Sequence, residues 1–236
     1  MMLESDIPRV TVWKINLQHL NPDQSSYNRF LSDQELEKSK RFYFEKDQRR
    51  YVQSHAILRM ILGEILGVSP ITLQFISNRF GKPYISSQHG YSELFFNLSH
   101  SQSGVVIAVS QGIECGVDIE YQRDVFPSRE IAEHFFSKVE IRSLLALPPE
   151  QQKEGFFNCW TRKEAFIKAK GQGLTIPLDS FDVSLVPGEA ARLLQSRLEP
   201  DDSERWSLVH LDTWNQYSSA LCAQSKNISY VIEEWE

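Results

Sequence analysis

The segment with the clearest potential for chemistry is a predicted helix that ends at Gly171. Trp160, Glu164 and Lys168 recur every four residues, so they share one helical face, and Lys163 stands beside them. One interpretation is a solvated helix, in which a Glu–Lys pair adds only about 0.3 kcal/mol. The other is a reactive carboxylate flanked by two amines. This segment alone leaves both interpretations open.

A second acidic pair lies upstream, in Gly116-Val117-Asp118-Ile119-Glu120. Asp118 and Glu120 are two residues apart on a predicted strand, so they point to the same face. Neighbouring carboxylates raise each other's pKa unless a positive group lies between them. Mg²⁺ is such a group, since it typically binds one or two carboxylates together with substrate phosphates. Glu164 is available as a third carboxylate, and Gly116 permits close backbone approach. The alternative is a strand end in solvent.

Candidate anion-binding groups occur at three other places. The Asn97–Ser101 segment follows an apolar strand and carries an imidazole and hydroxyls that can contact phosphate, although a polar turn has the same composition. Gly81-Lys82-Pro83 holds a lysine on a stiff turn. The basic run from Lys38 to Arg50 is expected to face solvent for the most part. Acids, amines and cations together suit a phosphorylated, nucleotide-like substrate and phosphoryl-type transfer. Neither a Walker loop nor a GxGxxG fingerprint occurs.

The elements that must position these groups follow from hydrophobic periodicity. A capping box at residues 32–35 opens a helix running towards residue 44, and a second helix ends at Gly67. The predicted order is strand, helices, strands, helices, strands, and the second half broadly repeats the plan of the first. We therefore predict an α+β fold of two similar α/β lobes, residues 1–112 and 113–236. Strands are expected at 10–17, 71–76, 94–98, 104–110, 115–120, 181–186, 205–211, 220–223 and 230–232, and helices also at 128–136 and 138–147.

The composition restricts the class of protein. The 236 residues carry a net charge of −6, which does not favour nucleic-acid binding. The three cysteines are far apart in the sequence, which favours reduced thiols in a cytoplasmic protein. We expect neither a secretory leader nor a membrane span, because no apolar run approaches 18 residues.

Taken in order, three motifs resemble those of the surfactin-synthetase-activating (Sfp) type of 4′-phosphopantetheinyl transferase. They are Phe96-Asn97-Leu98-Ser99-His100-Ser101, Gly116-Val117-Asp118-Ile119-Glu120, and Trp160-Thr161-Arg162-Lys163-Glu164-Ala165 with Lys168 beyond. The resemblance spans roughly residues 30–185. It implies the pseudo-twofold fold of two lobes with the active site between them, coenzyme A as donor, and an apo acyl or peptidyl carrier protein as acceptor. A monomer is implied as well.

The resemblance also implies roles for single residues. Asp118, Glu120 and Glu164 would hold Mg²⁺, with Mn²⁺ as the alternative cation, and Glu164, Lys168 and Asp118 would form the catalytic group. Lys163 and Lys168 would neutralise the pyrophosphate, and Ser99 would lie near the adenosine. The 3′-phosphate would be met by His100, Arg50, Lys82 and Lys38. Glu35 is a departure, since relatives often have a basic residue near that place.

Two further expectations concern packing and partners. Trp160 is expected to anchor its helix on the core. Arg129, Lys138 and Arg142 are candidate contacts for the carrier protein. Two other functions remain open at this point: a non-catalytic regulator that binds coenzyme A or a carrier, and a Mg²⁺-dependent hydrolase of nucleotide pyrophosphates.

Overall fold

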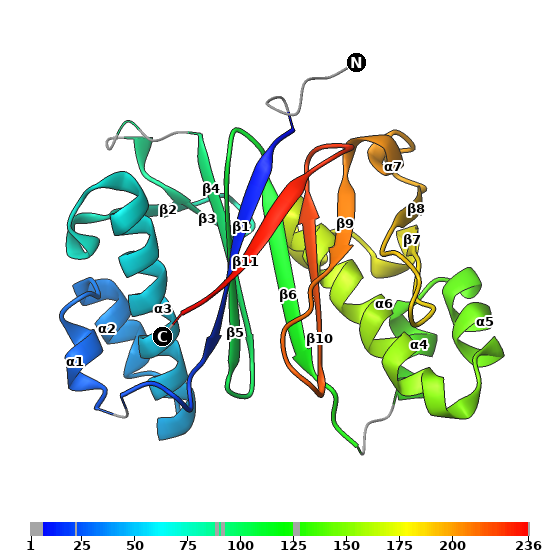
Figure 1. The fold of residues 1–236 in the computed structure, drawn as a ribbon, viewed down its shortest axis with the longest axis horizontal. Helices are drawn as coiled ribbons and strands as arrows, with labels where there is room; N and C mark the ends of the chain where they lie inside the picture. The colour runs from blue at the N-terminus through cyan, green and yellow to red at the C-terminus, as the bar shows by residue number, and fades with distance from the viewer. Residues whose placement is uncertain (1–6, 22, 88–89, 91–92, 125–127, 236) are drawn as a thin grey trace.

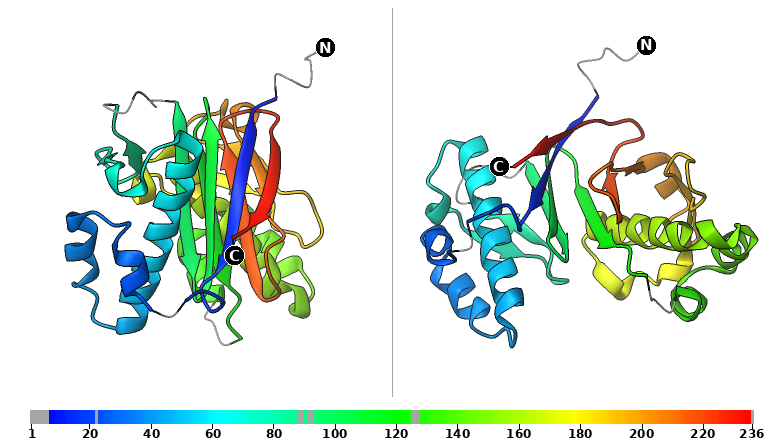
Figure 2. Two further views of the ribbon diagram at one scale, coloured as in Figure 1. Left: turned by 60° about the vertical axis from the view of Figure 1, so that its left-hand side comes forward. Right: turned by 60° about the horizontal axis from the view of Figure 1, so that its bottom comes forward.

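The protein, seen here in a computed structural model, folds into four layers: helices, a sheet, a second sheet and helices (Figure 1). The structure describes residues 7–21, 23–87, 90, 93–124 and 128–235. The two sheets lie next to each other in the middle, and the long helices α3 and α6 flank them on opposite sides (Figure 2).

The N-terminal lobe is built on a four-stranded sheet of order β11-β1-β5-β4. Its antiparallel strands are β1 (Arg9–Asn16), β4 (Leu94–Ser101) and β5 (Gly104–Gln111). The 22-residue helix α3 (Glu45–Leu66) packs on this sheet and ends at Gly67, whose φ of 66° suits a residue without Cβ. The smaller elements are α1 (Ser25–Asn28), α2 (Asp33–Ser39), the 3₁₀ turn η2 (Pro70–Thr72) and the hairpin of β2 (Phe75–Ser77) and β3 (Pro83–Ile85).

The C-terminal lobe repeats this plan with a three-stranded sheet of order β6-β10-β9. Its strands are β6 (Cys115–Tyr121), β9 (Ser207–His210) and β10 (Tyr217–Ala223). Helix α6 (Pro149–Lys170) also has 22 residues and also ends at a left-handed glycine, Gly171. The other elements are α4 (Ser128–Phe135), α5 (Lys138–Ala146), the 3₁₀ turns η4 (Gly173–Thr175) and η5 (Leu178–Ser180), β7 (Phe181–Val183), β8 (Leu193–Ser196) and α7 (Asp202–Arg205). The predicted α+β fold of two similar lobes is confirmed.

Apolar side chains fill the three spaces between the four layers. Under α3, Ile57 and Leu62 pack on Phe96 and Ile107. Under α6, a larger cluster contains Phe156, Phe166 and Phe181. Between the sheets, Val10 and Val106 of the N-terminal lobe meet Val117 and Leu221 of the C-terminal lobe. Because this middle cluster draws on both sheets, burial of apolar area holds the lobes together.

The last strand departs from the predicted division at residue 112. Strand β11 (Ser229–Glu234) crosses from the C-terminal lobe and pairs in parallel with β1 (Figure 1). Residues 229–234 therefore belong in space to the N-terminal sheet, although they close the chain. Sequence order could not reveal this pairing, because parallel strands can be joined by connections of any length. Helix α2 is also shorter than predicted, because it ends at Ser39 and not near residue 44.

Among the described residues, no helix is both long and apolar enough to cross a bilayer.

Candidate functional site

Several of the predicted site residues meet at a seam where β4 of one lobe lies beside β6 of the other. Three polar side chains of β4, spaced two residues apart, reach across it. Asn97 Oδ1 accepts a hydrogen bond from Val117 N at 2.9 Å. The Ser99 hydroxyl donates to Asp118 Oδ1 at 2.9 Å, and the Ser101 hydroxyl donates to Glu120 Oε2 at 2.8 Å. Polar contacts from the N-terminal lobe thus fix both acids of β6.

Helix α6 brings the remaining groups to these acids because Gly116 lets it lie directly on β6. A Cβ at Gly116 would stand 2.2 Å from Ala169 N and 2.4 Å from Ala165 O, so a larger residue would push the helix away. Lys168 Nζ lies 2.5 Å from Asp118 Oδ1 and 2.9 Å from Ser99 Oγ. The close approach expected at Gly116 is confirmed.

The carboxylates at the seam influence one another. Burial, reinforced by the nearby charge of Asp118, raises the pKa of Glu164 to about 7, although Lys168 opposes the rise. Burial and Asp118 also raise the pKa of Glu120. Glu164 lies one helical turn before Lys168, which bonds Asp118, so the three acids come to one region from two different elements.

The residues present fit a divalent cation in kind. Carboxylate oxygens are the donors that Mg²⁺ and Mn²⁺ prefer, and Asp118 Oδ2 is buried with no hydrogen-bond partner. The arrangement is nevertheless not a closed ligand set, because the described chain has no three His, Cys, Asp or Glu residues close enough together to hold a metal. Lys168 also occupies the other oxygen of Asp118. A cation therefore enters the account below only as a proposal.

A second group of cations lies beside the seam, on the face of β4 opposite to Ser99. His100 is exposed, and desolvation together with the charges of Arg50 and Lys168 lowers its pKa. Arg50 forms an ion pair of 3.1 Å with Asp47. Lys38 Nζ lies 5.3 Å from the ring centre of Tyr51. Tyr51 stands one helical turn before His55, and the charge of Lys38 helps to lower the pKa of His55. The structure thus gathers three of the four residues that were expected at a 3′-phosphate.

The fourth of these residues, Lys82, is placed elsewhere. Its Nζ is buried and donates to Cys115 O at 3.0 Å and Ala169 O at 2.8 Å, and it pairs with Glu114 at 2.5 Å. Its donors are thus fully engaged by the protein. The expectation that Lys82 contacts phosphate is not supported by this geometry.

Lys163 also differs from its expected role at the pyrophosphate. Its side chain is fully buried, and Nζ contacts Leu178 O at 2.6 Å, Phe181 O at 2.7 Å and Glu140 Oε1 at 2.8 Å. These partners belong to the C-terminal lobe around η5, β7 and α5. Lys163 therefore faces the interior and holds α6 to its own lobe, and it is not available to a ligand at the seam.

The structure also shows the partners of Ser99 and Glu35, which the sequence could not identify. The Ser99 hydroxyl lies at the acids, bonded to both Asp118 and Lys168. Glu35, which stands where relatives often have a basic residue, is paired with the buried Arg59 at 2.8 Å. The positive charge of Arg59 compensates the negative charge of Glu35. Glu35 is therefore not an unpaired acid beside the cations near His100.

Trp160 both packs and lines a cavity. It stacks on Phe156, with ring centres 6.2 Å apart, and meets Phe135 edge-on. It therefore anchors α6 as expected. The same indole borders a cavity of about 200 Å³ that reaches Glu120 and is lined by Glu120, Tyr121, Arg123, Ile131, Phe156, Phe157 and Trp160.

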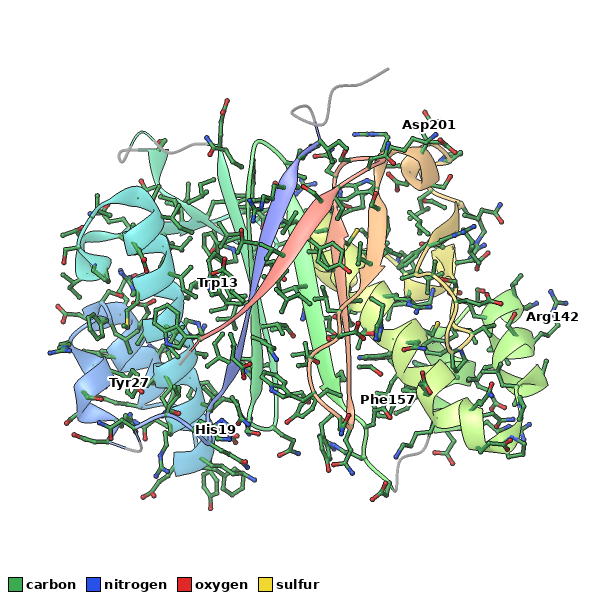
Figure 3. The ribbon with its side chains drawn as sticks, in the orientation of Figure 1. Trp13, His19, Tyr27, Arg142, Phe157 and Asp201 are labelled. Atoms are coloured by element: carbon green, nitrogen blue, oxygen red, sulfur yellow. The ribbon has the colours of Figure 1, made fainter. Side chains whose placement is uncertain are left out.

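The candidate carrier contacts Arg129, Lys138 and Arg142 are all exposed. Arg129 is paired with Glu133 at 2.9 Å. Arg142 lies at the outer edge of the C-terminal lobe (Figure 3). Exposure permits a role in docking but does not test one.

Sequence reasoning missed two residues that shape the site, Asn97 and Ser101. Both were part of a recognised motif, yet neither was given a role. The signal was available, because residues 97, 99 and 101 are spaced two apart along one strand and so must share one face of β4.

Comparison with known proteins agrees with this arrangement. The sequence profile described as "4′-phosphopantetheinyl transferase superfamily" matches residues 114–222, and that of "4′-phosphopantetheinyl transferase, N-terminal" matches residues 18–112. The 4′-phosphopantetheinyl transferase HetI of Nostoc sp. is 37% identical over 202 residues, which are 86% of this chain and 82% of that protein. The 4′-phosphopantetheinyl transferase Sfp of Bacillus subtilis is 38% identical over 157 residues, 66% of this chain and 67% of that protein.

Solved structures give a weaker likeness. A "Chronobacterium ammoniagenes ACPS-CoA complex" has 21% sequence identity and a TM-score of 0.36, and covers 48% of this chain and 96% of that one. The family assignment therefore rests on the sequence relatives and not on these structures.

Proposed function

Because the chain belongs to the 4′-phosphopantetheinyl transferase family, we propose that it transfers the 4′-phosphopantetheine group from coenzyme A to a serine of an apo carrier protein. The products are the holo-carrier and 3′,5′-ADP. The observation that carries this function is the convergence of Glu164 and Lys168 from α6 with Asp118 and Glu120 from β6 at the seam between the lobes. We also propose the Sfp type, acting as a cytoplasmic monomer on acyl or peptidyl carrier domains.

The proposed reaction is an in-line displacement at the β-phosphate of coenzyme A. The carrier serine oxygen forms a new bond to that phosphorus, and the bond from phosphorus to the oxygen of the departing 3′,5′-ADP breaks. Glu164 takes the serine proton, a role that its pKa of about 7 suits at neutral pH. Lys168, held at Asp118, stabilises the charge that develops on the leaving phosphate.

We propose that Asp118, Glu120 and Glu164 also hold Mg²⁺, or Mn²⁺ in its place. Such an ion, when bound, neutralises pyrophosphate charge and acts as a Lewis acid. The support is the buried, unpartnered Asp118 Oδ2 and the raised pKa of both glutamates. Mg²⁺ should raise the melting temperature of the wild type and have a smaller effect on Asp118→Asn. Equal shifts in the two proteins would remove Asp118 from the proposed ligands.

At the other end of the donor, we propose that His100, Arg50 and Lys38 meet the 3′-phosphate. Lys38 and His100 are exposed, Arg50 is partly exposed, and the charge of Arg50 acts on His100. Arg50 must exchange part of its pairing with Asp47 for the phosphate, an exchange that its partly exposed position permits.

One experiment separates this function from the two alternatives. The protein is mixed with coenzyme A, Mg²⁺ and an apo carrier domain, and the carrier is weighed by mass spectrometry. A gain of one phosphopantetheine group supports transfer. Release of 3′,5′-ADP without that gain indicates a pyrophosphate hydrolase, and neither product indicates a regulator that only binds coenzyme A or a carrier.

A further inference from the structure

The C-terminal end of helix α6 is capped by side chains from the other lobe. The last carbonyls of a helix have no partner within it. Here Ala169 O accepts from Lys82 Nζ at 2.8 Å, and Gly171 O accepts from Asn78 Nδ2 at 2.7 Å. Lys82 and Asn78 belong to the turn of the β2–β3 hairpin in the N-terminal lobe, more than 85 residues away in sequence.

The hairpin turn is itself rigid. Asn78 Oδ1 accepts from Phe80 N at 2.9 Å and from Lys82 N at 3.0 Å, so one side chain shapes the turn and presents Lys82. Gly81 has a φ of 92°, which few other residues adopt. The turn therefore holds Lys82 in the position from which it contacts α6.

The ammonium group of Lys82 also holds the segment that connects the lobes. It pairs with Glu114 at 2.5 Å and donates to Cys115 O at 3.0 Å, where β6 begins. Tyr84 of β3 donates to the other oxygen of Glu114 at 3.1 Å. Gly171 packs so tightly on Lys82 that a Cβ at Gly171 would stand 2.8 Å from Lys82 Cδ. One buried lysine thus joins the hairpin, the connection and the end of α6.

We propose that Lys82 is a positioning residue, which sets α6 against the N-terminal lobe so that Lys168 reaches Ser99 and Asp118. The inference deepens the proposed function and rests on it for its kinetic test. The charge is well suited to this place, because a cation at a helix C-terminus interacts favourably with the helix dipole. Ala169, which Lys82 binds, directly follows Lys168. A shift of the last helical turn would therefore move the Lys168 ammonium away from both of its partners.

The test compares two donors. A phosphate ligand would matter only for a donor that carries the 3′-phosphate, whereas a positioning residue matters for any donor. Lys82→Met should lower kcat about 10- to 100-fold with coenzyme A, as misplaced catalytic groups do. It should lower kcat by the same factor with dephospho-coenzyme A. Arg50→Gln is the reference for a phosphate contact and should affect mainly coenzyme A. Lys40→Met is the matched control, because Lys40 is exposed and its ion pair within the described part of the chain is with the exposed Glu37.

A loss confined to coenzyme A would overturn the proposal and return Lys82 to the phosphate. An unchanged kcat with both donors would overturn it as well. Hydrogen exchange gives a readout that does not depend on activity. Amides of residues 167–173 should exchange faster in Lys82→Met than in Lys40→Met, even if the wild type transfers nothing. Equal exchange in these two proteins would contradict the proposal.

A second variant serves if Lys82→Met does not fold. Asn78→Asp keeps the acceptors that shape the hairpin turn but removes the donor to Gly171 O. It should show the same faster exchange at residues 167–173 and the same equal loss of kcat with both donors, by a smaller factor. Wild-type exchange and turnover in Asn78→Asp would contradict a capping role for the hairpin.

Discussion

Lys168 of helix α6 pairs with Asp118 of strand β6 at the seam, with Nζ 2.5 Å from Oδ1. The Asp118 side chain is 4% exposed and that of Lys168 is 29% exposed. The lysine thus neutralises a buried carboxylate from the open side of the site, where a ligand can also reach it.

Lys168→Met should therefore impair both stability and transfer. Removing the partner of a buried charge costs about 3 kcal/mol, because the remaining carboxylate is left without compensation. Loss of one electrostatic group at the reacting phosphate should lower kcat about 10²- to 10³-fold. Urea unfolding and carrier-modification kinetics measure the two effects. The double variant Lys168→Met/Asp118→Asn should recover stability without recovering transfer. If transfer returned with stability, the lysine would have only a structural role.

Gly116→Ala should separate α6 from β6. The added Cβ would meet Ala169 N and Ala165 O at distances that no real contact shows, so the helix must move. Overpacking of this kind costs about 1–3 kcal/mol, and the shift should also remove most transfer activity. Gly112→Ala is the control, since a Cβ there meets nothing within 4 Å and only its φ of 78° causes strain. Comparable kinetics for the two variants would show that the close approach at Gly116 does not matter for activity.

His55 should make the protein less stable in mild acid. Its Nδ1 donates to Tyr51 O at 3.0 Å, and its ring lies 3.9 Å from that of Tyr51. Burial, together with the charges of Lys38 and His100, lowers the pKa of His55 from 6.5 to about 4, although Glu35 and the hydrogen bond to Tyr51 O oppose the shift. Between these pH values the unfolded chain binds a proton that the folded protein does not. The free energy of unfolding must therefore fall as the pH drops from about 6.5 to 4.

The expected loss from His55 is about 1.6 kcal/mol between pH 6.5 and pH 5, because the slope of 1.36 kcal/mol for each pH unit is reached only below pH 6.5, where the unfolded imidazole is half protonated. Urea unfolding of the wild type and of His55→Gln at both pH values measures it. The variant should lose less stability over this interval. Parallel losses in the two proteins would mean that His55 does not stay neutral in the fold.

The sequence predicted best where side-chain type and spacing determine the geometry. Asp118 and Glu120 had to share a face of one strand, and Glu164 and Lys168 a face of one helix. Gly116 was expected to permit close backbone approach, but the sequence did not show that α6 is the element that approaches. The capping box of α2 and the glycine ends of α3 and α6 depend on local hydrogen bonds and backbone angles. Residues that are close together in the sequence determine both.

The sequence predicted less well whether a long charged side chain lies in solvent or in the interior. Lys82 and Lys163 stand in recognisable motifs beside reactive groups, yet both are buried against backbone carbonyls. The carbonyls that accept their hydrogen bonds belong to distant segments, and hydrophobic periodicity does not predict which distant segments come together. The pairing of β11 with β1 is non-local in the same way.

The most direct test of the account is the initial rate at which an apo carrier gains phosphopantetheine mass, compared between Glu164→Gln and Glu154→Gln. Both changes lie on α6, but Glu154 is exposed and away from the acids, whereas Glu164 is the proposed base. The account predicts that Glu164→Gln keeps the wild-type unfolding curve and loses about 10²- to 10⁴-fold in rate, and that Glu154→Gln retains the wild-type rate. Equal rates for the two variants would contradict the assignment of catalysis to the seam.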